Sequence, residues 1–177
     1  MGENLNIRRI EKITLSEPGL IVSYVHNSVS ENLGKIAVIL SLKSNANQNS
    51  LENIGKKIAM HIAASNPISL NLDELDPKIV NKEKQVLIEQ AISSGKPKDI
   101  AEKMVQGRIR KFCDEIVLLE QTFVIDGKSK IKDILKQYSS ELGTNISIDS
   151  FKMLILGQGI EVEEKDFAAE VAATANQ

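Results

Sequence analysis

The chain has 177 residues, 42% of them hydrophobic, and its 22 Lys and Arg residues nearly balance 24 Asp and Glu residues. A chain of this length buries enough apolar surface to fold without disulfides or metals, and its net charge of −2 is unlike the basic charge of proteins that coat DNA. The single cysteine excludes an intrachain disulfide and a multi-cysteine zinc site, and two histidines are too few for a His-rich metal centre. No apolar run reaches the roughly 20 residues that cross a bilayer, so the sequence predicts a cytoplasmic protein that binds neither DNA nor a membrane.

The first third of the chain has the patterning of antiparallel strands. Residues 5–14 alternate loosely between apolar and charged positions, and residues 20–25 and 35–42 are rich in β-branched side chains. A polar stretch with turn-forming residues, 27–34, separates the last two. Because short connections join antiparallel neighbours, we predict two or three antiparallel strands here.

A helix is predicted after these strands. Ser50 can accept hydrogen bonds from the first free amides, and Pro67 marks the end because proline is poorly tolerated inside a helix. Between them, apolar residues recur at steps of three and four and form one stripe: Leu51, Ile54, Ile58 and Ile62. The stripe should cover one face of the sheet.

The middle third predicts two long helices, over residues 78–93 and 97–119, with a short connection between them. The apolar positions of the second helix recur nearly as in a heptad seam, and a short connection makes neighbouring helices antiparallel. We therefore expect a two-helix antiparallel coiled-coil arm. Nine basic residues stand against four acidic ones over residues 78–111. This excess fits either an ordinary solvated exterior or a basic projection that meets an acidic partner or RNA.

The last third returns to mixed structure. Residues 126–127 form a good turn pair, and Ser129 can cap a helix whose apolar stripe ends at Gly143. Residues 146–155 predict a strand pair or one strand with a register break, and a short Ala-rich helix is expected over residues 167–173.

Together these elements predict an α+β fold, in which a small antiparallel sheet with packed helices carries an inserted helical arm. We divide the chain into three parts. A core lobe of strands and a covering helix occupies residues 1–75, the coiled-coil insertion occupies residues 76–120, and the core lobe returns with a C-terminal helix over residues 121–177.

No residue pattern supports catalysis. The segment 127–129 resembles the end of a phosphate-binding loop, but Thr122 stands where the first glycine of such a loop is required. Cys113, near the apolar seam of the arm, is interpreted as a packed thiol because no histidine lies within reach along that helix. We therefore predict a protein that is not an enzyme and that uses no cofactor and no metal.

His61 is the histidine that stands out. On a helix it lies within about 20° of Ile54, at the edge of the apolar stripe, whereas Met60 points towards solvent. A boundary histidine beside an incidental methionine would account for both residues. They would also suit a contact patch, in which an exposed methionine offers adaptable apolar surface and the imidazole offers a hydrogen bond.

Several segments of the chain form a specific string of motifs. They are Gly2-Glu3-Asn4-Leu5-Asn6-Ile7-Arg8-Arg9, Ser23-Tyr24-Val25-His26, Met60-His61-Ile62-Ala63-Ala64, Ser94-Gly95-Lys96-Pro97-Lys98, and residues 100–108 and 166–172. These segments resemble the elongation factor Ts family and occur in the family's order from Gly2 to the C-terminus. The family comprises guanine-nucleotide exchange factors for the translational GTPase elongation factor Tu.

The resemblance implies an α+β core with a projecting antiparallel coiled coil, a cytoplasmic location, and elongation factor Tu as the partner. It implies that His61 in the Met-His-Ile-Ala-Ala motif contacts the GTPase. Ile36 and Ala37, at the start of the third predicted strand, match an apolar contact pair, although the family often has glycine at the second position. Val124 and Ile125, just after the arm, match a further apolar contact segment.

The chain departs from the family at its start. Family members usually begin with a three-helix module and a first core lobe, whose Thr-Asp-Phe-Val segment wedges near the Mg²⁺ and phosphate site of the GTPase. Neither is present, and Thr122-Phe123-Val124 lacks the aspartate and follows the arm. We expect that the N-terminal half was left out when the protein was prepared. We also expect the chain to bind elongation factor Tu but to promote GDP release poorly.

Two alternatives stay open. The chain could be a self-association module without exchange activity of its own, in which the arm or a sheet edge pairs between copies of a homodimer. The basic arm could instead contact RNA, in which case the affinity should fall steeply with salt.

Overall fold

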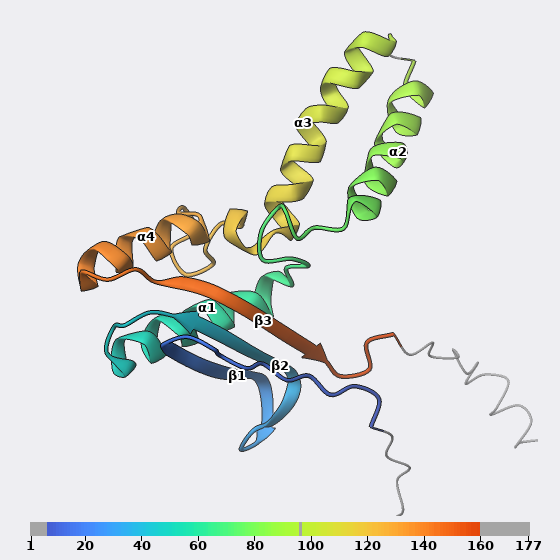
Figure 1. Ribbon diagram of the computed structural model, residues 1–177. Helices are drawn as coiled ribbons and strands as arrows, with labels where there is room; N and C mark the ends of the chain where they lie inside the picture. Colours follow the sequence, from blue (N-terminus) through green and yellow to red (C-terminus); the bar gives the residue numbers. More distant parts are fainter. Residues whose placement is uncertain (1–6, 96, 160–177) are drawn as a thin grey trace, which may run out of the picture.

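A computed structural model describes residues 7–95 and 97–159 of the chain. In this part of the chain, three antiparallel strands form one sheet in the order β1 (Gly19–Ser30), β2 (Leu33–Lys43) and β3 (Ser147–Ile155) (Figure 1). All the helices described lie between β2 and β3 in the sequence. The predicted α+β fold is thereby confirmed.

One face of the sheet packs against α1 (Gln48–Ser65). Alternate residues of a strand point to opposite faces, and in β2 the alternate residues Val38, Leu40 and Leu42 are buried in the core. The helix contributes the stripe that its periodicity predicts, and each member is at most 3% exposed: Leu51, Ile54, Ile58 and Ile62.

The ends of α1 are set by two asparagines. The side-chain oxygen of Asn47 accepts a hydrogen bond from the Ser50 amide at 2.8 Å, so Asn47 is the cap and Ser50, expected to be the cap, is its donor. At the other end Asn66 adopts the left-handed conformation with φ 47°, and its amide donates to the Ile62 carbonyl at 2.9 Å. The helix therefore ends before Pro67, as predicted.

Residues 7–18 do not form the strand that loose alternation suggested for this region. The isoleucines recur every third residue instead of every second, and Ile7 and Ile10 are 82% and 83% exposed. The segment is instead tied to the sheet by side chains, since Arg9 donates to the Ile155 carbonyl at 2.9 Å. Without a regular period of two, the segment has no apolar face to add to the sheet.

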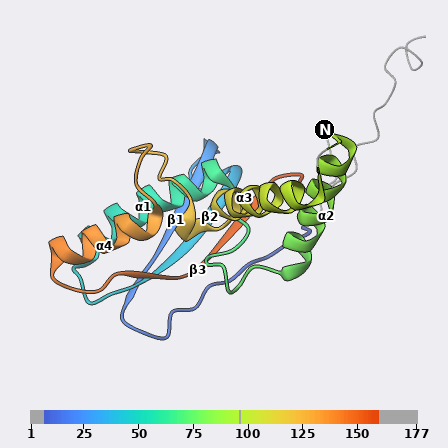
Figure 2. The ribbon, with the colours of Figure 1, turned by 90° about the horizontal axis from the view of Figure 1, so that it is seen from above.

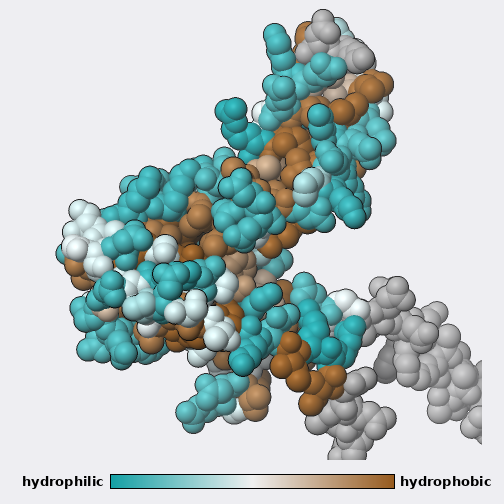
Figure 3. Space-filling model, in the orientation of Figure 1, coloured by the Kyte–Doolittle hydropathy of each residue, from teal (hydrophilic) through white to brown (hydrophobic). Residues whose placement is uncertain are grey.

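Two helices, α2 (Pro77–Ser93) and α3 (Lys98–Ile116), project away from the sheet (Figures 1 and 2). They lie side by side and run in opposite directions, as the short connection predicts. We call this unit the helical hairpin. An apolar strip lies between its two helices, with hydrophilic side chains on both sides (Figure 3).

The second helix of the hairpin ends at Ile116, three residues before the predicted end. Val117 takes an extended backbone with φ −100° and ψ 118° and forms a parallel bridge with Ser69. The Leu118 amide donates to the Ser69 carbonyl at 2.9 Å, and the short 3-10 helix η1 (Leu118–Glu120) follows. A backbone that pairs with an extended neighbour cannot also continue an α-helix.

The core is closed by α4 (Ile131–Leu142), which ends as predicted at Gly143 with φ 64°. The expected cap by Ser129 does not form. Lys130 occupies the capping position and makes no side-chain cap hydrogen bond. Its backbone is extended, with φ −76° and ψ 152°, and forms an antiparallel bridge with Thr122, so the helix begins one residue later than a cap at Ser129 requires.

Residues 147–155 form one strand with a register break, the second of the two predicted arrangements. The break falls opposite Ser41 and Leu42 of β2. The helix predicted over residues 167–173 lies outside the described residues. None of the helices in residues 7–95 and 97–159 combines the length and the apolar character needed to span a bilayer.

Replacing Gly55 by alanine should destabilise the protein. A Cβ atom at this position would lie 2.6 Å from Cγ2 of Val22 and 3.3 Å from Cδ1 of Leu42, so α1 would have to move away from the sheet. Overpacking of this kind costs about 1–3 kcal/mol, offset by about 1 kcal/mol of helix propensity. A lower midpoint of urea unfolding is the expected result.

Gly107→Ala is the matched control. Gly107 is exposed within α3, and a Cβ atom there would have no neighbour within 4 Å. Alanine should therefore raise the unfolding free energy by up to about 1 kcal/mol. If Gly55→Ala were as stabilising as Gly107→Ala, the close approach of α1 to the sheet would be contradicted.

Candidate functional site

The loop between η1 and α4, residues 122–130, presents two apolar side chains to solvent. Val124 is 46% exposed and Ile125 is 48% exposed. We call this segment the apolar loop. Two adjacent half-exposed branched side chains offer apolar area to a partner without first being uncovered.

Hydrogen bonds within the apolar loop hold its backbone in place. The Gly127 amide donates to the Phe123 carbonyl, and the Phe123 amide donates to the Ser129 carbonyl, both at 2.8 Å. Asp126 Oδ1 accepts from the amides of Lys128 at 2.9 Å and Ser129 at 3.1 Å. These bonds, above all the one from Lys128, lower the pKa of the Asp126 carboxyl, so the loop keeps a charged acceptor at its turn.

Ion pairs hold the two ends of the apolar loop together. Glu120 lies 2.8 Å from the Nζ atoms of Lys130 and Lys132, and Lys130 is also 3.0 Å from Asp114. The hydrogen bond from Lys130 is the main reason that the pKa of Glu120 is lowered. The loop thus starts and ends at one charged cluster on the surface of the core.

His61 lies directly beneath the apolar loop and is completely buried. Its Nε2 atom is 2.9 Å from Oε1 of Gln121, and its Nδ1 atom is 3.3 Å from the amide nitrogen of Val124. A backbone amide can only donate, so Nδ1 is the acceptor and Nε2 carries the hydrogen. The ring also packs against Phe123, with 5.9 Å between ring centroids.

The imidazole is a neutral group in this setting. Burial lowers the pKa of His61, and the hydrogen bond to Gln121 opposes the shift only in part. A charged ring would bring a hydrogen to Nδ1, where the Val124 amide already points its own hydrogen. The site therefore selects one protonation state and one tautomer of His61.

Gln121 completes this buried network. Its Nε2 atom donates to the carbonyl oxygen of Glu115 at 2.7 Å and to that of Ser65 at 3.3 Å. The sequence analysis did not identify Gln121, because its partner His61 is 60 positions away and no local pattern marks the pair. Together with the bond between Gln121 and His61, these two hydrogen bonds join the end of α1, the end of α3 and the residue that precedes the apolar loop.

The sequence placed His61 at the edge of the apolar stripe, either as a hydrogen-bonded boundary residue or as part of a contact patch. The structure corrects that placement: Gln121 and Phe123 cover that edge, and the imidazole has no exposed surface. Met60 is 37% exposed, in agreement with its predicted direction.

Ile36 and Ala37 do not lie on one surface. Neighbouring residues of β2 point to opposite faces of the sheet. Ile36 is half-buried and packs against the core beneath α1, whereas Ala37 is exposed on the other face, opposite Val25 of β1 and Leu154 of β3. Of the five candidate residues, the structure joins His61 with the apolar loop and keeps the β2 pair separate.

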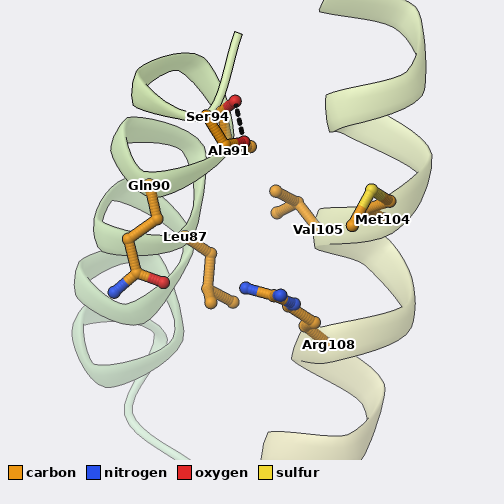
Figure 4. A pocket seen from close by; sticks show the side chains of 7 residues that line it. All are labelled: Leu87, Gln90, Ala91, Ser94, Met104, Val105 and Arg108. Carbon is orange, nitrogen blue, oxygen red and sulfur yellow. Dashed lines mark hydrogen bonds between the residues drawn. The ribbon is translucent and has the colours of Figure 1, made fainter. Parts of the chain in front are cut away.

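The helical hairpin holds a cavity of about 250 Å³ between α2 and α3 (Figure 4). Leu87 and Ala91 of α2 and Val105 of α3 contribute apolar side chains, and Arg108 lies beside them. The Ser94 hydroxyl is used locally and donates to the Ala91 carbonyl at 2.7 Å. Among the described side chains that line this cavity there is no histidine, cysteine or carboxylate, so these side chains offer no group for acid–base chemistry.

Cys113 is a half-buried free thiol on α3. Burial, and then the neighbouring Asp114, raise the pKa of its thiol, so the reactive thiolate is disfavoured. In residues 7–95 and 97–159 no group of three metal-binding side chains is close enough together to hold a metal ion.

The comparisons with known proteins identify the family. The family model described as elongation factor TS matches residues 1–158. This chain belongs to the elongation factor Ts family. It is 45% identical to elongation factor Ts of Rhodospirillum centenum over 99% of its own length and 57% of that protein. With elongation factor Ts of Rhodospirillum rubrum it shares 48% identity, over 98% of the chain and 56% of that protein.

The chain is shorter than the elongation factor Ts proteins that it matches. The relative from Erythrobacter litoralis, at 47% identity, is matched over 98% of this chain and 56% of its own residues. The chain therefore spans somewhat more than half the length of the elongation factor Ts proteins to which it is similar.

The unfolding free energy should fall as the pH drops below about 6.5, the ordinary value for an imidazole. Burial lowers the pKa of His61 in the folded protein. At a pH between this lowered pKa and the ordinary one, the imidazole is protonated in the unfolded chain but not in the folded protein. Stability is therefore highest above pH 6.5 and decreases until the pH reaches the lower pKa of the folded state. Urea unfolding between about pH 5 and 7.5 measures the trend.

His61→Asn provides the comparison, since it removes this titrating group and leaves the others. Its unfolding free energy should depend less on pH in the same range, and the Glu120 carboxyl, with an ordinary pKa of 4.5, titrates lower still. Equal pH dependence in both proteins would contradict a buried neutral imidazole.

Proposed function

We propose that this chain is part of a guanine-nucleotide exchange factor that binds elongation factor Tu and promotes GDP release in translation elongation, in the cytoplasm. Membership in the elongation factor Ts family supports the proposal. The observation that carries it is the apolar loop, with two exposed apolar side chains on a backbone fixed by hydrogen bonds. A surface ordered in advance loses little conformational entropy when a partner covers it.

The proposed contacts divide into two sets. Val124 and Ile125 supply the first from the apolar loop. Ile36 and Ala37 form the second at the start of β2, where each would be reached from its own face of the sheet. His61 belongs to the site through the loop that it supports.

Exchange of this kind involves no covalent step, so we propose no catalytic residue and no cofactor. An exchange factor binds the GTPase more tightly when nucleotide is loosely held, and by reciprocity the nucleotide then binds less tightly. Such coupling needs contacts that differ between the two states. The 177 residues contain no Thr-Asp-Phe-Val segment, and we propose that they supply affinity for elongation factor Tu and little of that difference.

Val124→Asp and Ile125→Asp should each weaken binding to elongation factor Tu by about tenfold or more. Both side chains are about half exposed, so aspartate is tolerated in the free protein but places a charge in the proposed apolar contact. Isothermal titration calorimetry measures the affinity, and circular dichroism checks that the variants are folded.

Ile68→Asp is the matched control, because Ile68 is 54% exposed at the base of the helical hairpin. It should leave the affinity nearly unchanged. If the loop variants bound as well as Ile68→Asp, the contact assignment would be wrong. Light scattering of the free chain tests the alternative of a self-association module, which predicts a dimer that forms through the helical hairpin or a sheet edge and that the loop variants leave intact.

The chain alone should accelerate GDP release from elongation factor Tu by less than about tenfold, even at saturation. Stopped-flow fluorescence with labelled GDP measures this rate, and a complete elongation factor Ts serves as the reference. Release as fast as with the complete factor would refute the proposed division between affinity and exchange.

A further inference from the structure

We propose that His61 is a positioning residue, which fixes the apolar loop from inside the core by accepting the Val124 amide at Nδ1. This inference deepens the proposed function, on which its consequence for binding rests. The effect on the loop itself stands on the hydrogen bonds alone.

The first step concerns the direction of the hydrogen bonds. The Nε2 atom of Gln121 lies within hydrogen-bond distance of two carbonyl oxygens, those of Glu115 and Ser65, so it must be the amide's donor end. Its Oε1 atom is therefore the end that faces His61, 2.9 Å away, and accepts from Nε2 of the imidazole. Two carbonyl acceptors thus fix the tautomer of a ring that neither of them touches.

The second step follows from that tautomer. With the hydrogen on Nε2, the Nδ1 lone pair is free to accept, and the Val124 amide lies 3.3 Å from it. The Ser65 hydroxyl, 3.4 Å from Nδ1, can donate to the same atom. Both groups facing Nδ1 can donate and share its one lone pair, so the neutral Nε2–H form is compatible with every contact in the network.

The third step concerns what the bond holds. The Val124 amide belongs to the peptide between Phe123 and Val124, and the next peptide carries Ile125. The Phe123 ring, packed on the imidazole, anchors one side of this unit in the core. The bond at Nδ1 therefore sets the point from which both exposed side chains of the apolar loop leave the core.

Other interactions of the apolar loop do not replace this bond. Asp126 orders the turn beyond Ile125, and Glu120 with Lys130 joins the two ends of the loop. These contacts lie within the loop and its flanks, whereas His61 connects the loop to α1, the helix that packs on the sheet. The loop can keep its turn yet still shift relative to the core if His61 no longer accepts.

Two substitutions separate the two ring nitrogens. In His61→Asn the amide oxygen takes the place of Nδ1, so the acceptor for Val124 is kept and the bond to Gln121 is lost. In His61→Gln the amide nitrogen takes the place of Nε2, so the bond to Gln121 is kept and the acceptor for Val124 is lost. Both variants remove the same ring and its packing on Phe123.

Amide hydrogen exchange of Val124 and Ile125 by nuclear magnetic resonance is the direct readout. We expect exchange in His61→Gln to be several-fold to about tenfold faster than in His61→Asn, the range of one hydrogen bond. A merely structural role of the ring would affect both variants alike. Equal exchange rates in the two variants would therefore overturn the proposal.

The wild-type protein gives a second test that requires no variant to fold. In protein labelled with ¹⁵N at histidine, the Nδ1 resonance of His61 should have the shift of an unprotonated acceptor nitrogen. A protonated Nδ1 would overturn the proposal.

Affinity for elongation factor Tu then separates this proposal from the proposed function. Binding should follow the exchange data, with His61→Asn several-fold tighter than His61→Gln. If the exchange rates differ as expected while the affinities do not, His61 positions the loop but the loop is not the contact surface. If the exchange rates are equal and Val124→Asp still weakens binding, the contact assignment holds and the positioning role fails.

Discussion

A buried hydrogen bond between His61 and Gln121 connects regions of the chain that are 60 residues apart in sequence. Through Gln121 it reaches the carbonyls at the ends of α1 and α3, and through His61 it reaches the apolar loop. Buried polar groups are tolerated only when they are paired, and in the described residues no buried side-chain nitrogen or oxygen lacks a partner. The positions of the loop, the hairpin base and the core helix are therefore mutually dependent.

Much of the fold could be predicted because it is governed by local periodicity. The stripe of α1, the two strands within β1 and β2, and the turn at Gly143 all follow from the spacing of neighbouring residues. The predicted helix ends that proved wrong lie where the backbone pairs with a residue outside the helix. Ser129 does not cap α4 because the next residue, Lys130, pairs with Thr122, and α3 stops at Ile116 because Val117 pairs with Ser69. Pairing of this kind cannot be predicted from the spacing of neighbouring residues.

The candidate site was only partly accessible from the sequence for the same reason. Resemblance to the family singled out His61 and Val124 separately, but their direct hydrogen bond emerged from the structure. The stripe geometry located His61 correctly on α1 and could not show what covers it. The separation of Ile36 and Ala37, in contrast, could have been predicted from the sequence. Alternation along a strand places two consecutive residues on opposite faces of the sheet.

The two ends of the helical hairpin join the core side by side. Ile68 donates to the Ile116 carbonyl at 2.8 Å and Leu118 donates to the Ser69 carbonyl at 2.9 Å, so the two connecting strands are clamped side by side. Beyond this clamp the two helices of the hairpin pack mainly on each other. Evolution can thus lengthen, trim or recharge this projection while the packing of the sheet stays the same.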